Sequence, residues 1–366
     1  MRLGVLTSSR ADYSIYLPLL RAIQNDSRYQ LDIIVFGTHL SEQSGATISS
    51  IEADGFHPKH KIMTAPEGDT PEAISQSMGL AITRFSHHWG SQRYDLVFCL
   101  GDRYEMFAAC ASAVPFGIRL AHIQGGETTE GAIDNIFRHS ITQMASLHFT
   151  CTEQYKKRVV ELMGNSNGVY NVGSLSIDNL SALKLLSKEE FQIQFGINLG
   201  VPSILITFHP ETVSFEKNDF FIGELIEALR EIDGYQYIFT MPNADTANLG
   251  IRSHLKNYIS STPHAKGVES FGTVGYLSCM KHCSFMMGNT SSGFAEASYF
   301  PKYVVNLGNR QRGRMVTSNI YSCPIEKTEI IRAVHTFSTK TSFPHIDVYG
   351  DGHAAKKIME ILNHVK

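Results

Sequence analysis

The chain has 366 residues, of which 43% are hydrophobic and only 18% are charged. Such a chain can bury a large core in two domains, and this composition argues against a disordered or coiled-coil protein. The formal net charge of −3 lacks the basic excess that nucleic-acid binding or adhesion to an acidic membrane requires.

The six cysteines are scattered along the chain, several of them in apolar runs. This pattern predicts reduced, buried thiols in a cytoplasmic protein. Cys279 and Cys283 are four residues apart, but no His/Cys cluster completes a zinc set, so we expect no metal site. We also expect neither a signal peptide nor a membrane-spanning segment, because the N-terminus soon turns polar and no apolar run approaches membrane length.

The first part of the chain alternates short apolar runs with amphipathic stretches, which is typical of a parallel α/β sheet. Pro71 can open a long helix, because the first helical turn does not need the N–H that proline lacks. The strands predicted here are 2–7, 31–36, 95–100, 118–122 and 147–151. The first predicted helix is marked by the apolar spacing of Ile15, Leu19, Leu20 and Ile23. The later helices are predicted at 71–89, 105–113, 132–145 and 153–163.

The same alternation returns after a connecting stretch at 181–200. The strands predicted in this second part are 203–207, 235–240, 284–287 and 303–306, and a last helix is predicted at 354–365. We expect an N-terminal Rossmann-like domain over 1–174, a C-terminal one over 175–350, and a helix in 351–366 that packs back on the first domain. Two such α/β domains with parallel sheets that face each other across a deep cleft form the arrangement called GT-B.

Acids, an arginine and imidazoles follow two neighbouring strands of the first domain. Asp102 and Arg103 come after strand 95–100, and His122 ends the strand that precedes Glu127. Ligands of open α/β sheets bind beyond the carboxyl ends of the strands, so we predict a catalytic pocket here.

Asp134 and Arg138 follow one helical turn apart. Their alternative interpretation is a surface ion pair worth a few tenths of a kcal/mol. Clustered carboxylates repel one another unless a substrate needs them, which favours the catalytic interpretation.

Two other stretches could bind phosphate groups. Arg10 and Ser14 follow the first strand at the start of a helix, where a guanidinium and a hydroxyl can meet phosphate oxygens. The alternative is that Asp12 or Ser14 only caps that helix. In the run GNTSSGFAEA, Thr290 and Ser291 offer hydroxyls and backbone N–H groups after a strand.

Further along that run, Glu296 is expected about two turns inside a helix, where its carboxylate can accept hydrogen bonds from ribose hydroxyls. The alternative for the whole run is an ordinary Asn/Ser-rich cap. Arg310 follows the next strand and adds positive charge, unless it belongs to a solvated loop. His209 in FHP and Asn243 in MPN end two other strands, and their side chains can point into a cleft.

These motifs in this order resemble the UDP-N-acetylglucosamine 2-epimerase family, in particular its hydrolysing branch in sialic acid synthesis. The resemblance is carried by SRADYS, GDRYE, HIQGGE, IDNIFRHSIT, FHP and GNTSSG. It extends from about residue 9 to about residue 314, which is nearly the whole chain. It implies a GT-B fold and a homodimer or homotetramer. The implied reaction converts UDP-GlcNAc and water to N-acetylmannosamine and UDP through 2-acetamidoglucal, with no metal or other cofactor.

The resemblance also implies roles for individual residues. Those implied for acid–base work at the sugar are Asp102, Glu127, Asp134 and Arg138, with His209 at the phosphate–sugar junction. Those implied for UDP binding are Arg10, Ser14, Arg103, His209, Asn243, Phe271, Thr290, Ser291, Glu296 and Arg310. The chain departs from many relatives at Gln124, where they have a glutamate. An amide cannot act as a base, so Glu127 or Asp134 does that work, or the role never lay at this position.

The sequence leaves other activities open. A sibling enzyme would act on a UDP- or GDP-linked 2,4-diacetamido-2,4,6-trideoxyhexose, and a non-hydrolysing epimerase would interconvert UDP-GlcNAc and UDP-ManNAc. The runs TTEGAID and RHSIT favour the hydrolysing branch. A GT-B glycosyltransferase or a UDP-sugar sensor would not need the clustered carboxylates.

Overall fold

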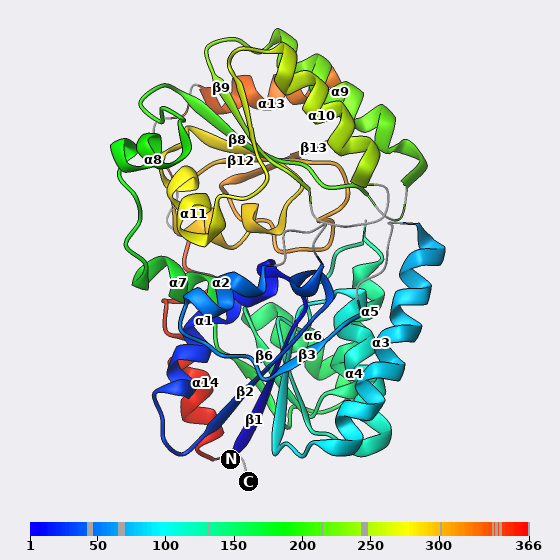
Figure 1. The fold of residues 1–366 in the computed structure, drawn as a ribbon. Helices are drawn as coiled ribbons and strands as arrows, with labels where there is room; N and C mark the ends of the chain where they lie inside the picture. Colours follow the sequence, from blue (N-terminus) through cyan, green and yellow to red (C-terminus); the bar gives the residue numbers. More distant parts are fainter. Residues whose placement is uncertain are drawn as a thin grey trace. The chain divides into compact units, whose positions relative to one another are not determined.

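The computed structural model describes residues 1–41, 47–64, 70–130, 132–211, 213, 215–242, 248–300, 302–338, 340, 343 and 346–364. The chain divides into two compact units (Figure 1). Unit 1 comprises Met1–Glu127, Asp134–Ser181 and Val348–Lys366. Unit 2 comprises Thr128–Ile133 and Ala182–Asp347. Each unit contains one parallel sheet, which confirms the predicted α/β class.

The sheet of unit 1 has seven strands in the order β3-β2-β1-β4-β5-β6-β7. Its strands are β1 (Arg2–Thr7), β2 (Gln30–Phe36), β3 (His60–Ile62), β4 (Leu96–Leu100), β5 (Leu120–Ile123), β6 (Leu147–Thr150) and β7 (Val169–Asn171). The residues of β4 and β5 are buried throughout. Strands covered on both faces read as unbroken apolar runs, which is why the sequence revealed them.

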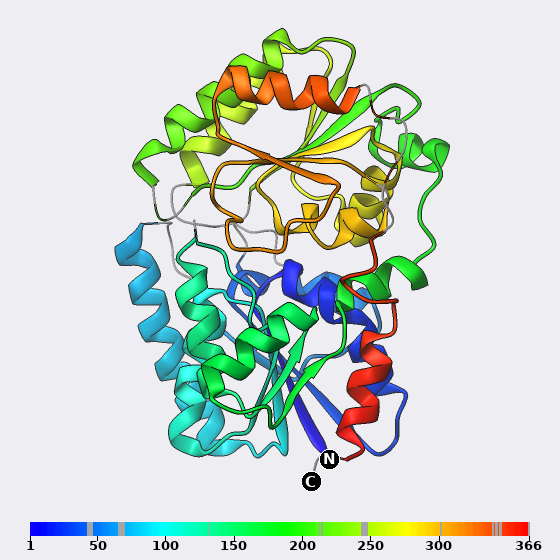
Figure 2. The same ribbon diagram turned by 180° about the vertical axis from the view of Figure 1, so that it is seen from behind.

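Helices cover both faces of this sheet. On one face α1 (Arg10–Gln24) and α14 (Ala354–Leu362) share a core cluster with β1 (Figure 2). On the other face lie α3 (Pro71–Ser91), α4 (Tyr104–Ala113) and α5 (Asp134–Met144). The remaining helical segments of unit 1 are η1 (Gly37–Leu40), α2 (Ile48–Ala53), η3 (Val114–Phe116), α6 (Glu153–Met163) and α7 (Leu175–Ala182), the last of which ends at the first residue of unit 2.

The start of α14 is fastened to unit 1 by a buried carboxylate. Oδ1 and Oδ2 of Asp178 accept hydrogen bonds from the backbone N–H groups of Ala354 and Ala355, at 2.9 and 2.7 Å. The first N–H groups of a helix have no partner inside the helix, so Asp178 satisfies two of them. The C-terminal helix therefore belongs to the core of unit 1.

The sheet of unit 2 has six strands in the order β10-β9-β8-β11-β12-β13. Its strands are β8 (Ser203–Thr207), β9 (Gln236–Thr240), β10 (Ala265–Val268), β11 (Phe285–Gly288), β12 (Val304–Leu307) and β13 (Ile320–Cys323). Helices α9 (Asn218–Glu231), α10 (Asn248–Ser261) and α13 (Lys327–Ser338) share one core cluster with this sheet. The other helical segments are α8 (Lys188–Phe195), η4 (Phe215–Lys217), α11 (Gly272–His282), η5 (Ser291–Gly293) and α12 (Glu296–Tyr299).

The strands that the sequence pattern did not reveal are β3, β7, β10 and β13, and these are the edge strands of the two sheets. An edge strand has one neighbour and is partly exposed, so it needs no buried apolar run. In β3 Lys61 is exposed and His60 is only partly buried, and in β10 Lys266 is exposed. Smaller corrections concern helix limits: the predicted helix 132–145 begins at Asp134, and the last helix ends at Leu362.

All six cysteines are buried free thiols, as the sequence predicts. Within the described ranges no helix is long and apolar enough to cross a membrane. The described residues also contain no group of three or more His, Cys, Asp or Glu side chains that could hold a metal ion.

Candidate active site

The acidic cluster of unit 1 is built around the buried side chain of Arg138. Its guanidinium donates to Oδ2 of Asp102, which follows β4, and NH1 lies 3.9 Å from Oε2 of Glu127, which follows β5. The side chains of Arg138 and Glu127 are almost fully buried, whereas that of Asp102 is 22% exposed. The surface ion-pair interpretation of Arg138 is therefore wrong, because this arginine is buried and pairs with residues distant in the sequence.

Asp134 is the first residue of α5 and stands one turn before Arg138. Its side chain is half-buried. The structure thus brings Asp102, Glu127 and Arg138 together, with Asp134 on the same helix as the arginine. A buried guanidinium between carboxylates lets their negative charges coexist, since each acid has a positive partner.

His122 links the ends of β4 and β5 to α5 and is fully buried. Its Nε2 lies 2.8 Å from the carbonyl oxygen of Gly101, and Nδ1 lies 3.1 Å from Oγ1 of Thr142. A carbonyl oxygen can only accept, so Nε2 carries a proton. Burial disfavours the charged ring and lowers the pKa of His122 to about 3. A neutral His122 therefore positions the residue before Asp102 and cannot act as an acid near neutral pH.

Gln124 is the one non-glycine residue with a positive φ among the described residues, at +64°. Its backbone N–H is bonded to the carbonyl oxygen of Phe149, at 3.0 Å. Gly126 has to be a glycine, because it has a φ of +80° and a Cβ there would lie 2.3 Å from the carbonyl oxygen of Tyr155. Gly125 is tightly packed, since a Cβ there would lie 3.1 Å from Nδ1 of His122. A left-handed backbone at a residue with a side chain costs free energy and is concentrated at functional sites.

Arg103 is held by Glu105, a residue of the motif GDRYE to which the sequence assigned no role of its own. The carboxylate of Glu105, buried in the first turn of α4, accepts from Nε and NH2 of Arg103 at 3.2 and 3.1 Å. Such a two-point contact fixes the plane of the guanidinium. The sequence feature that could have predicted this ion pair is the spacing Arg-x-Glu at the start of a helix.

The turn after β1 is organised by Asp12. Its carboxylate accepts from the N–H of Ser8 at 2.8 Å, the N–H of Ser9 at 3.0 Å and the hydroxyl of Thr7 at 2.7 Å. The His39 ring, whose Nε2 lies 3.8 Å from Oδ1 of Asp12, together with the hydrogen bonds from the backbone and from Thr7, outweighs burial and lowers the pKa of Asp12. This agrees with the capping role that the sequence left open for Asp12. Arg10 and Ser14 share the first turns of α1, and Arg10 is exposed.

In unit 2 the loops after β8 and β11 are tied together by Asn289. Its side-chain amide accepts from the N–H of His209 at 2.7 Å and donates to the carbonyl oxygen of His209 at 2.8 Å. Gly288 allows this close approach, because a Cβ there would lie 1.9 Å from the carbonyl oxygen of Thr207. Asn289, which the sequence did not single out, therefore fixes the backbone of His209.

Hydroxyl groups gather in the loop that follows Asn289. Oγ of Ser292 lies 2.5 Å from the hydroxyl of Tyr276 and 3.2 Å from Oγ1 of Thr290. Ser291 is exposed and begins η5. Glu296 is the first residue of the short α12, so its predicted place two turns inside a helix is wrong. The 3₁₀ turn η5 takes up the residues that the pattern assigned to the start of one longer helix.

Phe271 and Asn243 are the remaining residues of unit 2 that were predicted to bind UDP. Phe271 is buried, and its ring centroid lies 5.2 and 4.9 Å from those of Phe191 and Phe195. Its ring thus belongs to an aromatic cluster, and the predicted place near uracil stays a prediction. Asn243 lies outside the described residues.

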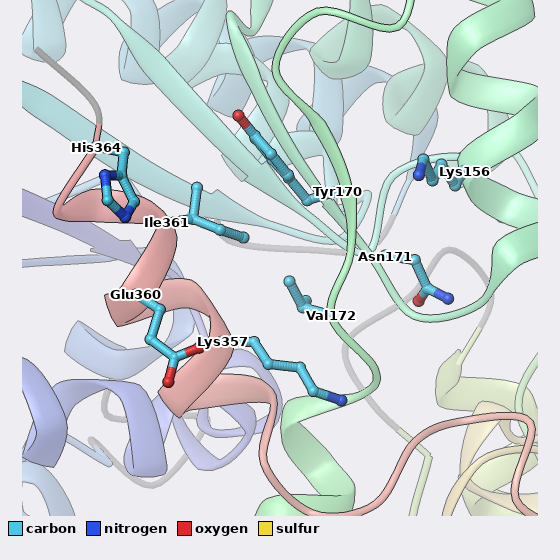
Figure 3. Close-up of a pocket in the computed structure, with 8 residues that line it drawn as sticks. All are labelled: Lys156, Tyr170, Asn171, Val172, Lys357, Glu360, Ile361 and His364. Carbon is cyan, nitrogen blue, oxygen red and sulfur yellow. The ribbon is translucent and has the colours of Figure 1, made fainter.

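A cavity of about 360 Å³ lies beside α14 in unit 1 (Figure 3). It is lined by Lys156, Tyr170, Asn171, Val172, Lys357, Glu360, Ile361 and His364. Nζ of Lys357 is bonded to Oδ1 of Asp351 at 3.0 Å, so its charge is already neutralised. None of the predicted site residues lines this cavity, and we assign it no part in the site.

Comparison with known proteins supplies the family context. A family model described as UDP-N-acetylglucosamine 2-epimerase matches residues 21–363. A Campylobacter jejuni protein named GDP/UDP-N,N'-diacetylbacillosamine 2-epimerase (hydrolyzing) is 36% identical over 88% of this chain and 84% of its own length. The Escherichia coli polysialic acid biosynthesis protein P7 is 34% identical over 90% of this chain and 84% of its own length.

A solved structure shows the same fold. The crystal structure of Methanocaldococcus jannaschii UDP-GlcNAc 2-epimerase in complex with UDP-GlcNAc and UDP matches with a TM-score of 0.85. The match covers 100% of both chains at 19% sequence identity, so it supports the GT-B-like pair of Rossmann-like domains and no more.

The backbone of Gln124 yields a prediction about stability. Gln124→Gly should leave the free energy of unfolding within about 1 kcal/mol of the wild type, because glycine accepts a positive φ. Gln124→Val should lower it by about 1–2 kcal/mol, because a β-branched residue resists that backbone. Urea unfolding measures both. Gln76→Val, at an exposed position of α3, is the control and should cost only about 0.5 kcal/mol. Equal stability of the glycine and valine variants at position 124 would contradict the prediction.

The lowered pKa of His122 yields a second prediction. The imidazole should stay neutral with its proton on Nε2 between pH 5 and pH 8, as read from ¹⁵N–¹H spectra of the ring. An unfolded histidine takes up its proton near pH 6.5, so this residue should reduce stability as the pH falls from about 6.5 toward 3. His122→Asn should flatten that part of the pH–stability curve. A ring that titrates between pH 5 and pH 8 would refute the assignment.

Proposed function

Because the chain belongs to the UDP-N-acetylglucosamine 2-epimerase family, we propose that it is a hydrolysing 2-epimerase that converts UDP-GlcNAc and water to N-acetylmannosamine and UDP. The observation that carries the proposal is the buried Arg138 between Asp102 and Glu127, after β4 and β5 of unit 1. The names of the two relatives, one hydrolysing and one of polysialic acid biosynthesis, support the branch and a role in making sialic acid-type sugars.

The reaction needs proton transfer at a carbon atom. A carboxylate takes the C2 proton of the sugar while the C1–O bond to UDP breaks, which leaves 2-acetamidoglucal and UDP. Water then adds its oxygen to C1, and C2 takes a proton on the opposite face, which inverts that centre. The C2 proton is weakly acidic, and a positioned acid or base contributes about 10²–10⁴-fold to such a step.

Asp102 is paired with Arg138 and keeps solvent access, and Glu127 and Asp134 are the other candidates for proton transfer. Arg138 orients Asp102 and offsets the negative charge of the two acids beside the sugar. Gln124 stands between these residues in sequence and offers an amide instead of a base. This supports a division of work in which Asp102, Glu127 and Asp134 share the protonation steps.

We assign UDP binding to unit 2, with a contribution from Arg10, Ser14 and Arg103 of unit 1. The departing diphosphate needs positive charge and hydrogen-bond donors. Arg310, the hydroxyls of Thr290 and Ser291, and His209 supply groups of this kind. Glu296 accepts from the ribose hydroxyls. These assignments require no metal ion.

A second candidate substrate is a UDP- or GDP-linked 2,4-diacetamido-2,4,6-trideoxyhexose. The observation that favours it is the 36% identity to the C. jejuni protein named for diacetylbacillosamine. Both substrates undergo the same elimination and differ at C4 and C6 of the sugar, so the proton chemistry is common to both.

The elimination predicts a specific isotope result. Incubation with UDP-GlcNAc in D₂O should release UDP and leave one deuterium at C2 of free N-acetylmannosamine, detected by NMR of the sugar. Protium at C2 would exclude elimination, and UDP-ManNAc without free UDP would identify a non-hydrolysing enzyme. A parallel panel with the UDP- and GDP-linked diacetamido sugars decides between the two candidate substrates.

Asp102→Asn tests the acid cluster itself. It should lower kcat by about 10²–10⁴-fold, because the amide cannot transfer the proton, and it should leave the Kd of UDP within about twofold, since UDP binding is assigned mainly to unit 2 and Asp102 to the sugar. Asp351→Asn, which changes an exposed acid of unit 1, is the control and should keep wild-type kinetics. A loss of UDP affinity as large as the loss of rate would make Asp102 a structural residue.

A further inference from the structure

Glu211 is a buried acid of unit 2 that follows His209 and Pro210 and whose place in the proposed reaction is not yet explained. Its Oε1 accepts from the backbone N–H groups of Asn309 and Arg310, at 2.7 and 3.2 Å. The side chain is almost fully buried. One carboxylate after β8 thus holds the first residues of the loop after β12.

Neighbouring residues hold Glu211 in the position from which it binds Asn309 and Arg310. Asn218 accepts from the N–H of Glu211 at 2.9 Å and donates to its carbonyl oxygen at 3.2 Å, so the backbone of Glu211 is fixed. Gly308 has a φ of +69°, and a Cβ there would lie 2.6 Å from Oε1 of Glu211. The loop after β12 therefore leaves room for the carboxylate.

Arg310 is held at two places as a result. Its backbone N–H is bonded to Glu211, and NH1 of its guanidinium lies 3.4 Å from the carbonyl oxygen of Asn289. That carbonyl also accepts from Nε2 of Gln311, at 2.8 Å. Asn289 also fixes the backbone of His209. The side chain of Arg310 therefore rests against the same residue that holds His209.

Burying a carboxylate is costly unless hydrogen bonds compensate for the lost water. Hydrogen bonds from two N–H groups to a charged oxygen are stronger than those to a neutral one and hold their donors more firmly.

We propose that Glu211 is a positioning residue for the diphosphate group: it fixes the backbone of Arg310 and thereby aims the guanidinium at the phosphate oxygens. This inference rests on the proposed function, in which unit 2 binds UDP through Arg310. Glu211 acts through Arg310 and does not touch the substrate.

The test is a double-mutant cycle with UDP as the probe, read by isothermal titration calorimetry on the full chain. Arg310→Ala should weaken UDP binding about tenfold or more, as loss of a charge-assisted contact does. Glu211→Ala should weaken it to a similar extent. The double variant should be no weaker than Arg310→Ala alone, because both changes remove the same interaction.

Two controls separate positioning from general damage to the fold. Glu211→Gln should weaken UDP binding by only about threefold, less than Glu211→Ala, because its amide oxygen still accepts from both N–H groups but lacks the charge that strengthens those hydrogen bonds. Ile330→Ala, on the buried face of α13, should lower the melting temperature and leave the Kd of UDP unchanged, since an aliphatic side chain makes none of the hydrogen bonds that hold Arg310.

Additive losses in the double variant, or a wild-type Kd for Glu211→Ala, would overturn the inference and leave the proposed function standing. A wild-type Kd for Arg310→Ala, or no binding of UDP by the wild-type protein, would overturn the assigned diphosphate site itself. The failure of the inference is therefore distinguishable from the failure of the proposed function.

Discussion

The buried guanidinium of Arg138 is the constraint on which the site of unit 1 depends. A buried charge is tolerated only with close partners, and Arg138 finds them in Asp102 after β4 and Glu127 after β5. These partners come from two strands that are neighbours in the sheet, while the arginine comes from α5. The ion pairs therefore form only when α5 is packed at the correct position along the sheet. They place two acids at one end of the sheet.

Both units position their polar groups by fixing the backbone beside them. In unit 1 the neutral ring of His122 binds the carbonyl of Gly101, directly before Asp102. In unit 2 the amide of Asn289 holds His209 from both sides. Such contacts reduce the freedom of a side chain without touching a ligand, and preorganised groups of this kind stabilise developing charge at no cost of rearrangement during the reaction. The residues that do this are themselves uncharged and buried, which makes them inconspicuous in a sequence.

The interior strands were predictable because burial on both faces demands an apolar run, and β4 and β8 are such runs. The edge strands β3, β7, β10 and β13 were not, because one-sided pairing places no such demand. The start of a helix was also predicted wrongly where a short 3₁₀ turn precedes it. Glu296 begins α12 because η5 precedes it, and no local propensity marks that 3₁₀ turn. The roles of the site residues at UDP and at the sugar stay predictions from the family resemblance.

The sequence by itself determined the α/β class, the interior strands, the family, and the presence of acids after β4 and β5, because these follow from short-range patterns and ordered motifs. Only the tertiary structure decided how those residues are paired. Asp134 and Arg138 are neighbours on a helix, yet the arginine reaches Asp102 and Glu127. Arg103 is bound by Glu105, and the loop that carries Arg310 is held by Glu211. Pairing depends on which strand ends and helix turns lie next to each other in the folded chain. A local sequence pattern carries no information about which distant residues become neighbours.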